Sequence, residues 1–512
     1  MLTSSAHRTQ PAAERRLPAA PTAAGAMAIL AAAAYSAISL YRHNQFGSTL
    51  DLATQTQTVW GYSRFEIIPN TVIGIPNLLG DHFHPILMLL APLFWIWDSA
   101  AVLLLAQGVL LALAGVPVYL WGAQQLGERA GLAFQASFYL YWGILAGVVF
   151  DFHHVVVAVA AVSWALYATV TRRNRLLASM VAVAMLSRED VALTLIALGF
   201  YILVVQRRFL LGAGVMAVNA AWFALLLGVV MPALGGLPYR HWTYQGLGSG
   251  PASSILHVVE HPIASLELLF TPIAKARVWI ASFGNWLFLP LISPLALIAI
   301  PSFLERFWND IPEVWNFHMQ YSMLSAPILA FAAVDGAARV NRFWSTRSSA
   351  TISARMALAV LAAAAVLSVA VNPLAELGNY VSNPTVADIQ SCLETIPPTA
   401  SVAATQELLP HLATRSRIYQ IPILQTDGPQ LDPVSAGVDD IAIDLASDGN
   451  DEGELRSVVR GAFGAGYGVV CTKELTVILA KGATTQTLTP QLAHWLAGEC
   501  GGRACMSMSG PA

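Results

Sequence analysis

The chain has 512 residues, of which 56% are hydrophobic and 11% are charged. Soluble globular proteins carry about 25% charged residues, so this composition excludes an ordinary soluble enzyme and is typical of a polytopic membrane protein. The formal net charge of −3 and the lack of a Lys/Arg-rich block give no reason to expect a nucleic-acid partner.

Apolar runs recur between residues 22 and 371. A helix needs about 20 apolar residues to cross a bilayer upright, and several of these runs are shorter. The short runs come in adjacent pairs, which indicates hairpins that are re-entrant or that end partway through the bilayer. The expected spans are 22–41, 99–121, 131–150, 155–171, 176–186, 191–205, 209–231, 278–289, 291–303, 321–334 and 355–371.

Arginines in the short loops indicate how these spans thread the membrane. Those within 172–175, 207–208 and 339–355 belong in the cytoplasm if positive charge stays inside. One threading of about eleven passes places them, with the arginine-bearing N-terminal tail 1–21, on that side. The amino terminus is then cytoplasmic and the carboxyl terminus outside. Only Lys and Arg are used to choose this threading. It also places every histidine between residues 22 and 371 on the outer side.

The character of the chain changes after residue 371. Residues 372–512 alternate helical patterns with apolar strand-like runs, which favours a small, mostly parallel sheet covered by helices. We expect an extracytoplasmic α/β domain that caps the core 22–371 or recognises a partner. Its four cysteines form disulfides, with three possible connectivities, or stay in part as free buried thiols. The expected strands are 401–404, 418–421, 440–444, 467–472 and 475–480.

Asp51 lies shortly after the first span, in a loop with aromatic and hydroxyl neighbours. A carboxylate there can act as a general base that takes a proton from an attacking hydroxyl. The alternative is an aspartate that caps the helix predicted to continue through Thr58.

Two short outer segments concentrate histidine and aspartate. Imidazole and carboxylate are the usual ligands of zinc, manganese and similar cations, and two such segments can meet over the mouth of the bundle. A divalent ion (Mg, Mn or Zn) there would neutralise a phosphate leaving group. No spacing matches a specific metal signature, so interfacial histidines and helix-capping aspartates are the alternative. The residues are Asp81, His82, His84, Asp151, His153 and His154.

The segment Ser187-Arg188-Glu189-Asp190 lies between two apolar runs, where ionisable residues are costly and often functional. Arg188 can bind a phosphate, with Glu189 or Asp190 as a second catalytic carboxylate. The alternative is a charged hairpin tip that marks the water interface.

Other candidate phosphate-binding residues lie in later outer segments. Arg240, Lys275 and Arg277 can hold a lipid phosphate at the headgroup level, or they can simply anchor the interface. His318 and Tyr321 lie three residues apart and can share one face of a helix.

Glycine-rich stretches at 246–250 and 461–468 lack the strand-turn-helix context of a nucleotide fingerprint, so no nucleotide cofactor is expected.

Several weak motifs together resemble a known family. This combination covers nearly the whole chain after residue 21 and resembles DUF2079, a bacterial family of polytopic membrane proteins of unknown function. The motifs are Asp-Leu from 51, Asp-His-Phe-His-Pro from 81, Asp-Phe-His-His from 151, Arg-Glu-Asp-Val from 188, His-x-x-Tyr from 318, Ile-Pro-x-x-Ala-Ser-Val from 396 and Pro-His-Leu from 410.

That family is similar in layout to the C-class membrane glycosyltransferases, which take sugars from polyprenyl-phosphate carriers. In those enzymes an acid in the first outer loop is the catalytic base, and only Asp51 matches that position. The resemblance implies an inverting transfer in which Asp51 deprotonates the acceptor hydroxyl while a cation or an arginine stabilises the departing phosphate. It also implies a bacterial plasma (inner) membrane protein that works with membrane lipids, a polyprenyl-phosphate-linked sugar and an envelope glycan, lipid or protein acceptor.

Two other classes of function stay open. A transporter or lipid flippase would use the broken hairpins at 176–205 and 278–303 as a substrate site near mid-membrane. A transporter also predicts paired internal repeats, and none is visible in the sequence. A non-catalytic envelope scaffold predicts that the outer acids and histidines lie apart in space.

Overall fold

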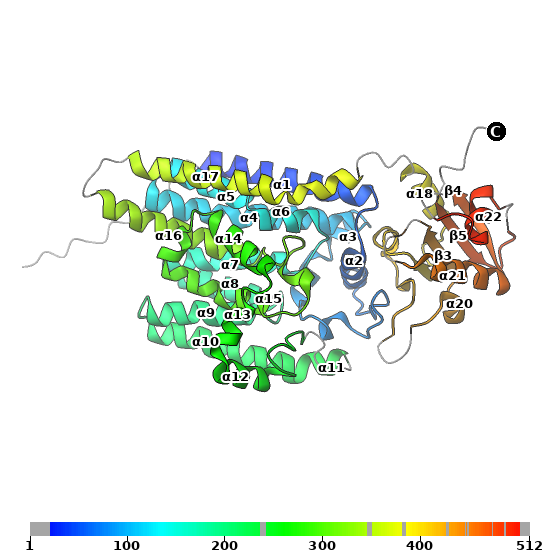
Figure 1. The fold of residues 1–512 in the computed structure, drawn as a ribbon, viewed down its shortest axis with the longest axis horizontal. Coiled ribbons are helices and arrows are strands. Elements are labelled where there is room, and N and C mark those ends of the chain that lie inside the picture. Colours follow the sequence, from blue (N-terminus) through cyan, green and yellow to red (C-terminus); the bar gives the residue numbers. More distant parts are fainter. Residues whose placement is uncertain are drawn as a thin grey trace, which may run out of the picture.

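The chain is seen here in a computed structural model that is mostly helical, with a small sheet near its C-terminal end (Figure 1). The residues that the structure describes are 21–235, 242–345, 351–380, 386–425, 430–445, 447, 450–473, 475–485 and 488–501.

Helices that lie side by side form the larger part of the molecule (Figure 1). The central helix α4 packs against α1, α5, α7 and α16, around one continuous apolar core. The helices are α1 (Pro21–Asn44), α2 (Leu50–Ser63), α3 (Leu93–Ile96), α4 (Ala101–Leu126), α5 (Glu128–Tyr139), α6 (Trp142–Val149), α7 (Val155–Val170), α8 (Asn174–Met185), α9 (Val191–Val204), α10 (Phe209–Leu225), α11 (Met231–Gly235), α12 (Pro251–Glu260), α13 (Pro262–Leu268), α14 (Ile273–Gly284), α15 (Ile300–Phe307), α16 (Ser325–Ser345) and α17 (Thr351–Val371).

Four of the described helices are long and apolar enough to cross a membrane, namely α1, α4, α17 and the continuous helical stretch Phe209–Gly235, which begins with α10 and ends with α11. The bent pair α5 and α6 adds a fifth if it counts as one span, with 43° between its two parts. Within α4 the most apolar stretch is 67% buried, whereas in Phe209–Gly235 and in α17 it is only 17% buried. A soluble protein rarely leaves so large an apolar surface exposed, so these helices are typical of a lipid-facing perimeter.

The shorter apolar helices α7, α8 and α9 lie where the sequence predicts short paired runs. The expected spans 278–289 and 291–303 are not continuous helices. After α14 the chain continues in two 3₁₀ turns, Leu289–Ile292 and Pro294–Ala299, before α15 begins. Prolines at 290, 294 and 301 explain the breaks, because each removes a backbone donor from a helical hydrogen-bond ladder.

A five-stranded sheet with the order β2-β1-β3-β5-β4 forms the centre of the C-terminal part. The sheet is mixed: β1 pairs in parallel with β2 and β3, and β5 pairs antiparallel with β3 and β4. The expectation of a mostly parallel sheet is wrong because β4 and β5 form a hairpin, whereas parallel neighbours need a crossover of about a dozen residues. Its elements are α18 (Val386–Leu393), β1 (Val402–Ala404), α19 (Leu409–Leu412), β2 (Ile418–Gln420), α20 (Pro433–Ala436), β3 (Asp440–Asp444), α21 (Glu452–Gly464), β4 (Tyr467–Lys473), β5 (Thr476–Lys481) and α22 (Pro490–Ala497).

A disulfide between Cys392 and Cys471 joins α18 to β4, with the two Cα atoms 5.5 Å apart. Cys500 is disulfide-bonded as well, and Cys505 lies outside the described residues. The structure therefore selects one of the three connectivities that the sequence leaves open for Cys392.

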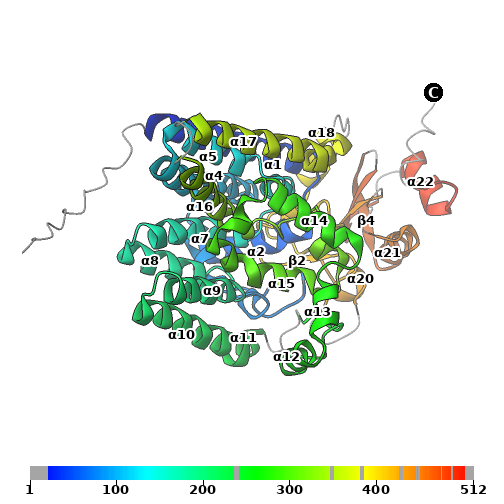
Figure 2. The ribbon, with the colours of Figure 1, turned by 60° about the vertical axis from the view of Figure 1, so that its left-hand side comes forward.

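The short helix α2 lies between the helical core and the sheet in both views (Figures 1 and 2). Gln57 of α2 donates a hydrogen bond to the Ser416 carbonyl 3.1 Å away, and Thr71 both accepts from and donates to the backbone of Ile418. An apolar cluster joins Ala53 of α2 to Leu409 of α19. The C-terminal part is thus docked directly on the helix that carries Asp51.

Candidate active site

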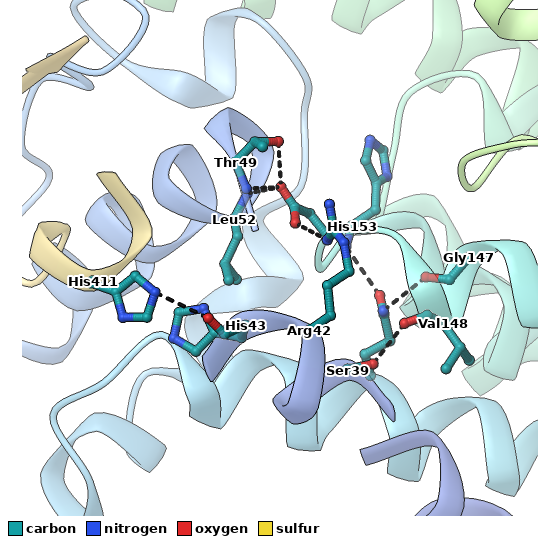
Figure 3. Close-up of polar contacts among 11 residues, drawn as sticks. Ser39, Arg42, His43, Thr49, Leu52, Gly147, Val148, His153 and His411 are labelled. Carbon is teal, nitrogen blue, oxygen red and sulfur yellow. Dashed lines mark hydrogen bonds and ion pairs between the residues drawn. The ribbon is translucent and has the colours of Figure 1, made fainter. Parts of the chain in front are cut away.

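A buried carboxylate from another segment fixes the first turn of α2. Oδ2 of Asp151 accepts hydrogen bonds from the Thr49 amide at 2.9 Å, the Thr49 hydroxyl at 3.1 Å and the Leu52 amide at 3.3 Å (Figure 3). Oδ1 of Asp151 accepts from Nη1 of Arg42 at 2.7 Å. Thr49 is the N-cap residue of α2, but its side chain accepts no hydrogen bond from the first backbone amides of the helix. Asp151 therefore supplies the charge that α2 needs at its N-terminus.

Asp51 lies in this first turn and is partly exposed. Among the described residues no hydrogen bond to its carboxylate is found, so Asp51 does not act as a cap. Burial, together with the negative charges of Asp151 and Asp81, raises the pKa of Asp51 to about 7, although the nearby His82 charge acts in the opposite direction. A carboxylate with a pKa near neutrality is suited to general-base catalysis.

His82 and Glu189 form an ion pair beside Asp51. Nδ1 of His82 lies 2.8 Å from Oε1 of the fully buried Glu189, whose Oε2 accepts from the Phe83 amide at 3.0 Å. Burial alone would lower the pKa of His82, but the charge and hydrogen bond of Glu189 outweigh it and raise that pKa. Burial opposes the charged form of Glu189, but His82 and Arg188 lower its pKa on balance. Because His82 also lines a cavity, the pair of His82 and Glu189 lies beside that cavity.

Arg188 contacts two further acids. Its Nη2 lies 2.8 Å from Oδ2 of Asp190 and 3.4 Å from Oε1 of Glu305 in α15. Burial, followed by the charge of Asp190, raises the pKa of Glu305 well above its usual range. Two carboxyl groups therefore share one guanidinium.

These groups border a cavity of about 170 Å³. Asp51 is not one of the lining residues, but the charge of the lining residue His82 affects its pKa, so the two side chains interact. The lining residues are His82, His153, Val155, Arg188, Asp190, Thr243, Tyr244, Ser302, Glu305, Arg306, Asn309, Ile311, Val314, Gln320, Tyr321 and Leu324.

The four histidines among the predicted metal ligands come together, with their rings tilted against one another. The ring centroid of His154 lies 4.1 Å from that of His153, 4.7 Å from that of His84 and 5.2 Å from that of His82. Burial lowers the pKa of His84 to about 4, so its ring is neutral. Within the described segments no group of three His, Cys, Asp or Glu side chains is arranged to hold a metal ion. The divalent ion therefore stays a prediction, and no catalytic step is derived through it.

Other predicted phosphate-binding residues lie away from the cavity. Nζ of Lys275 donates hydrogen bonds to the backbone carbonyls of Leu268 at 3.1 Å and Phe307 at 2.7 Å. Lys275 therefore ties the end of α13 to α15. Arg277 is exposed and does not line the cavity, and neither does the exposed His318. Arg240 lies outside the described residues.

Sequence patterns do not single out Arg42, Glu305 or Tyr244 as parts of the site. One signal was available for Arg42. It directly follows an apolar run, at the end that the arginine count assigns to the outer side, where a cation is unexpected. Such an exception indicates a charge that is held by a specific partner, here Asp151.

Comparison with solved structures gives the same architecture at low sequence identity. The crystal structure of ArnT from Cupriavidus metallidurans bound to undecaprenyl phosphate is 12% identical, with a TM-score of 0.54, and the match covers 90% of this chain and 99% of that chain. The archaeal oligosaccharyltransferase AglB from Archaeoglobus fulgidus, in complex with an inhibitory peptide and a dolichol-phosphate, is 12% identical with a TM-score of 0.46, over 88% of this chain and 73% of that one.

The likeness to ArnT confirms the expected C-class fold of the core. No curated protein matches the chain significantly in sequence. The family model of the predicted membrane proteins DUF2079 matches residues 42–470, and the chain therefore belongs to this family.

Proposed function

We propose that the chain is an inverting membrane glycosyltransferase. It transfers a sugar from a polyprenyl-phosphate donor to an envelope glycan, lipid or protein on the outer face of the bacterial inner membrane. The fold similarity to an ArnT structure that binds undecaprenyl phosphate supports the class of donor. The observation that carries the proposal is the carboxylate of Asp51, whose pKa is raised to about 7 and which interacts with His82, a lining residue of the cavity that also contains Arg188.

The chemistry is a single displacement at the anomeric carbon. Asp51 removes the proton from the acceptor hydroxyl, whose oxygen forms the new bond to that carbon as the bond from carbon to phosphate oxygen breaks. The electron pair stays on the departing lipid phosphate. Arg188 and the imidazolium of His82 lie where they can stabilise this charge in a partly dehydrated cavity. Attack from the face opposite the leaving group inverts the anomeric configuration.

The membrane arrangement is part of the proposal. It has about eleven passes, a cytoplasmic tail 1–21, a transmembrane core 22–371 and an extracytoplasmic α/β domain 372–512. The disulfide between Cys392 and Cys471 supports an outer location for that domain, because disulfides persist in oxidising compartments. Helix α2 lies at the domain's end of the core, whereas the loops that follow α7 and α9 lie at the opposite end (Figure 1).

The experiment compares lipid-linked saccharides in cells that carry the wild type, Asp51→Asn or Asp98→Asn at equal expression. Asp98 is the matched control because it is a half-exposed surface acid that pairs with Arg64. We expect Asp51→Asn to accumulate the unused glycolipid donor and to lose one envelope sugar, whereas Asp98→Asn resembles the wild type. Identical glycolipids and envelope sugars in Asp51→Asn and wild type would contradict the proposal.

A further inference from the structure

Two acids from distant segments meet on one nitrogen of Arg188. Asp190 stands at the start of α9 and Glu305 lies in α15, which packs against α9 (Figure 2). One guanidinium compensates only one negative charge, and burial together with the charge of Asp190 raises the pKa of Glu305. Both acids line the same cavity, beside the guanidinium that they share.

Acceptor atoms at the cavity lack donors. Asp190 is only 7% exposed, and its Oδ1 has no hydrogen-bond partner among the described residues. The same is true of the amide oxygen of Gln320, a residue that is only 4% exposed. A buried polar atom without a hydrogen-bond partner lowers the stability of the folded state, and such atoms are rare in native structures. Both residues line the cavity, so a ligand with at least two O–H or N–H donors would satisfy them.

The rest of the lining fits a polyol. Tyr244 and Tyr321 supply aromatic surfaces, while Asn309 and Ser302 supply further polar groups. A phosphate or a lipid tail offers no hydrogen-bond donors to Asp190 and Gln320 when the phosphate is ionised. Among the groups of a glycolipid, the hydroxyl or amino groups of the sugar are the ones that can donate to them.

We infer that Asp190, Glu305 and Gln320 form a saccharide subsite that binds the hydroxyl or amino groups of a sugar. Asp190 and Gln320 accept hydrogen bonds from the sugar, and Glu305 lies beside them in the lining, 3.4 Å from Nη2 of Arg188. The inference rests on the proposed glycosyl transfer and assigns the specificity of that reaction to these residues. The same chemistry fits the sugar of the lipid donor and a saccharide acceptor.

The test measures binding to the full-length protein in lipid nanodiscs. The probes are polyprenyl phosphate, the polyprenyl-phosphate derivatives of glucose, mannose and arabinose, and the methyl glycosides of the same sugars. We expect at least one glycosylated lipid or one methyl glycoside to bind. Asp190→Asn and Gln320→Leu should each weaken its affinity about tenfold, which is the effect of one lost hydrogen bond to a charged or buried group. Asp98→Asn is the control and keeps wild-type affinities.

The arms separate the possible outcomes. The subsite holds the donor sugar if the glycosylated lipids bind more tightly than polyprenyl phosphate and the two variants abolish only this difference in affinity. If only a methyl glycoside responds to the variants, it holds the acceptor. The subsite would be overturned if the protein bound polyprenyl phosphate and all its glycosylated forms with equal affinity and bound no methyl glycoside. That result would not decide the transferase proposal, which the Asp51→Asn variant tests. Absence of binding of any lipid would count against the proposed function instead. Gln320→Leu leaves Arg188 and its ion pairs intact, so its effect does not depend on the folding of an Asp190 variant.

Discussion

Nη1 of Arg42 lies 2.7 Å from Oδ1 of Asp151, and the two side chains are only 8% and 0% exposed. Asp151 thereby links the C-terminal end of α1 to the first turn of α2, which carries Asp51 (Figure 3). The position of the proposed base thus depends on a buried ion pair rather than on α2 alone.

Removing one partner of the buried pair should destabilise the protein more than removing both. Asp151→Leu or Arg42→Met alone leaves an uncompensated buried charge, at a cost of about 3–5 kcal/mol. The double variant Arg42→Met with Asp151→Leu removes both charges and should regain much of this stability. Thermal unfolding in detergent provides the measurement. A double variant that is as unstable as the sum of the two single variants would show that the pair does not hold α2.

The pH dependence of sugar transfer should follow Asp51. Its pKa is raised to about 7, and only the deprotonated form can accept a proton, so the rate should rise with pH up to about 7 and then level off. The His82 charge lowers this pKa, so His82→Gln should move the midpoint to higher pH, whatever it does to the maximum rate. The transfer rate is measured between pH 5 and 9. A midpoint that stays in place or moves to lower pH in His82→Gln would rule out Asp51 as the titrating base.

The His82–Glu189 pair should stabilise the protein chiefly under acidic conditions. The pKa of His82 is raised in the folded state, so its contribution is fully present below its usual pKa of about 6.5 and is lost as pH rises through the folded value. His82→Gln should therefore lower the unfolding temperature more at pH 6 than at pH 9. The exposed His261 gives the control variant His261→Gln, which should show no such difference. A larger loss for His82→Gln at pH 9 would contradict the ion pair.

The α/β domain should hold α2 through Thr71. The hydroxyl of Thr71 pairs with both the amide and the carbonyl of Ile418, and Thr71→Val keeps its shape while leaving these groups unpaired. The expected cost is about 1–3 kcal/mol. Faster amide hydrogen exchange in α2 and a lower transfer rate should accompany it. Unchanged exchange in α2, together with a normal rate, would mean that the domain does not position the site.

Short-range patterns in the sequence predict the helices and strands better than they predict which distant residues contact one another. The strands lie within one residue of the predicted bounds, and four of the acids and histidines predicted for one face line the cavity, namely His82, His153, Asp190 and Glu305. Spacing alone cannot decide which aspartate caps α2, because Asp151 is 102 residues from Thr49. For the same reason Lys275 reads as a phosphate ligand, although the carbonyl groups of Leu268 and Phe307 bind it in the folded chain.

Glu305 shows a second limit of sequence patterns. In the sequence it is one acid among several after an apolar run, and its role depends on α15 packing against α9. Only that packing brings it to Arg188 and Asp190.

The most direct measurement of the central claim is sugar transfer in reconstituted proteoliposomes. Polyprenyl-phosphate sugars and an envelope acceptor fraction are supplied on the side that exposes the α/β domain, and free polyprenyl phosphate is measured over time. The wild type and Asp98→Asn should release it in step with glycosylation of the acceptor, whereas Asp51→Asn should release almost none. Release by Asp51→Asn at the wild-type rate would contradict the account of Asp51 as the catalytic base.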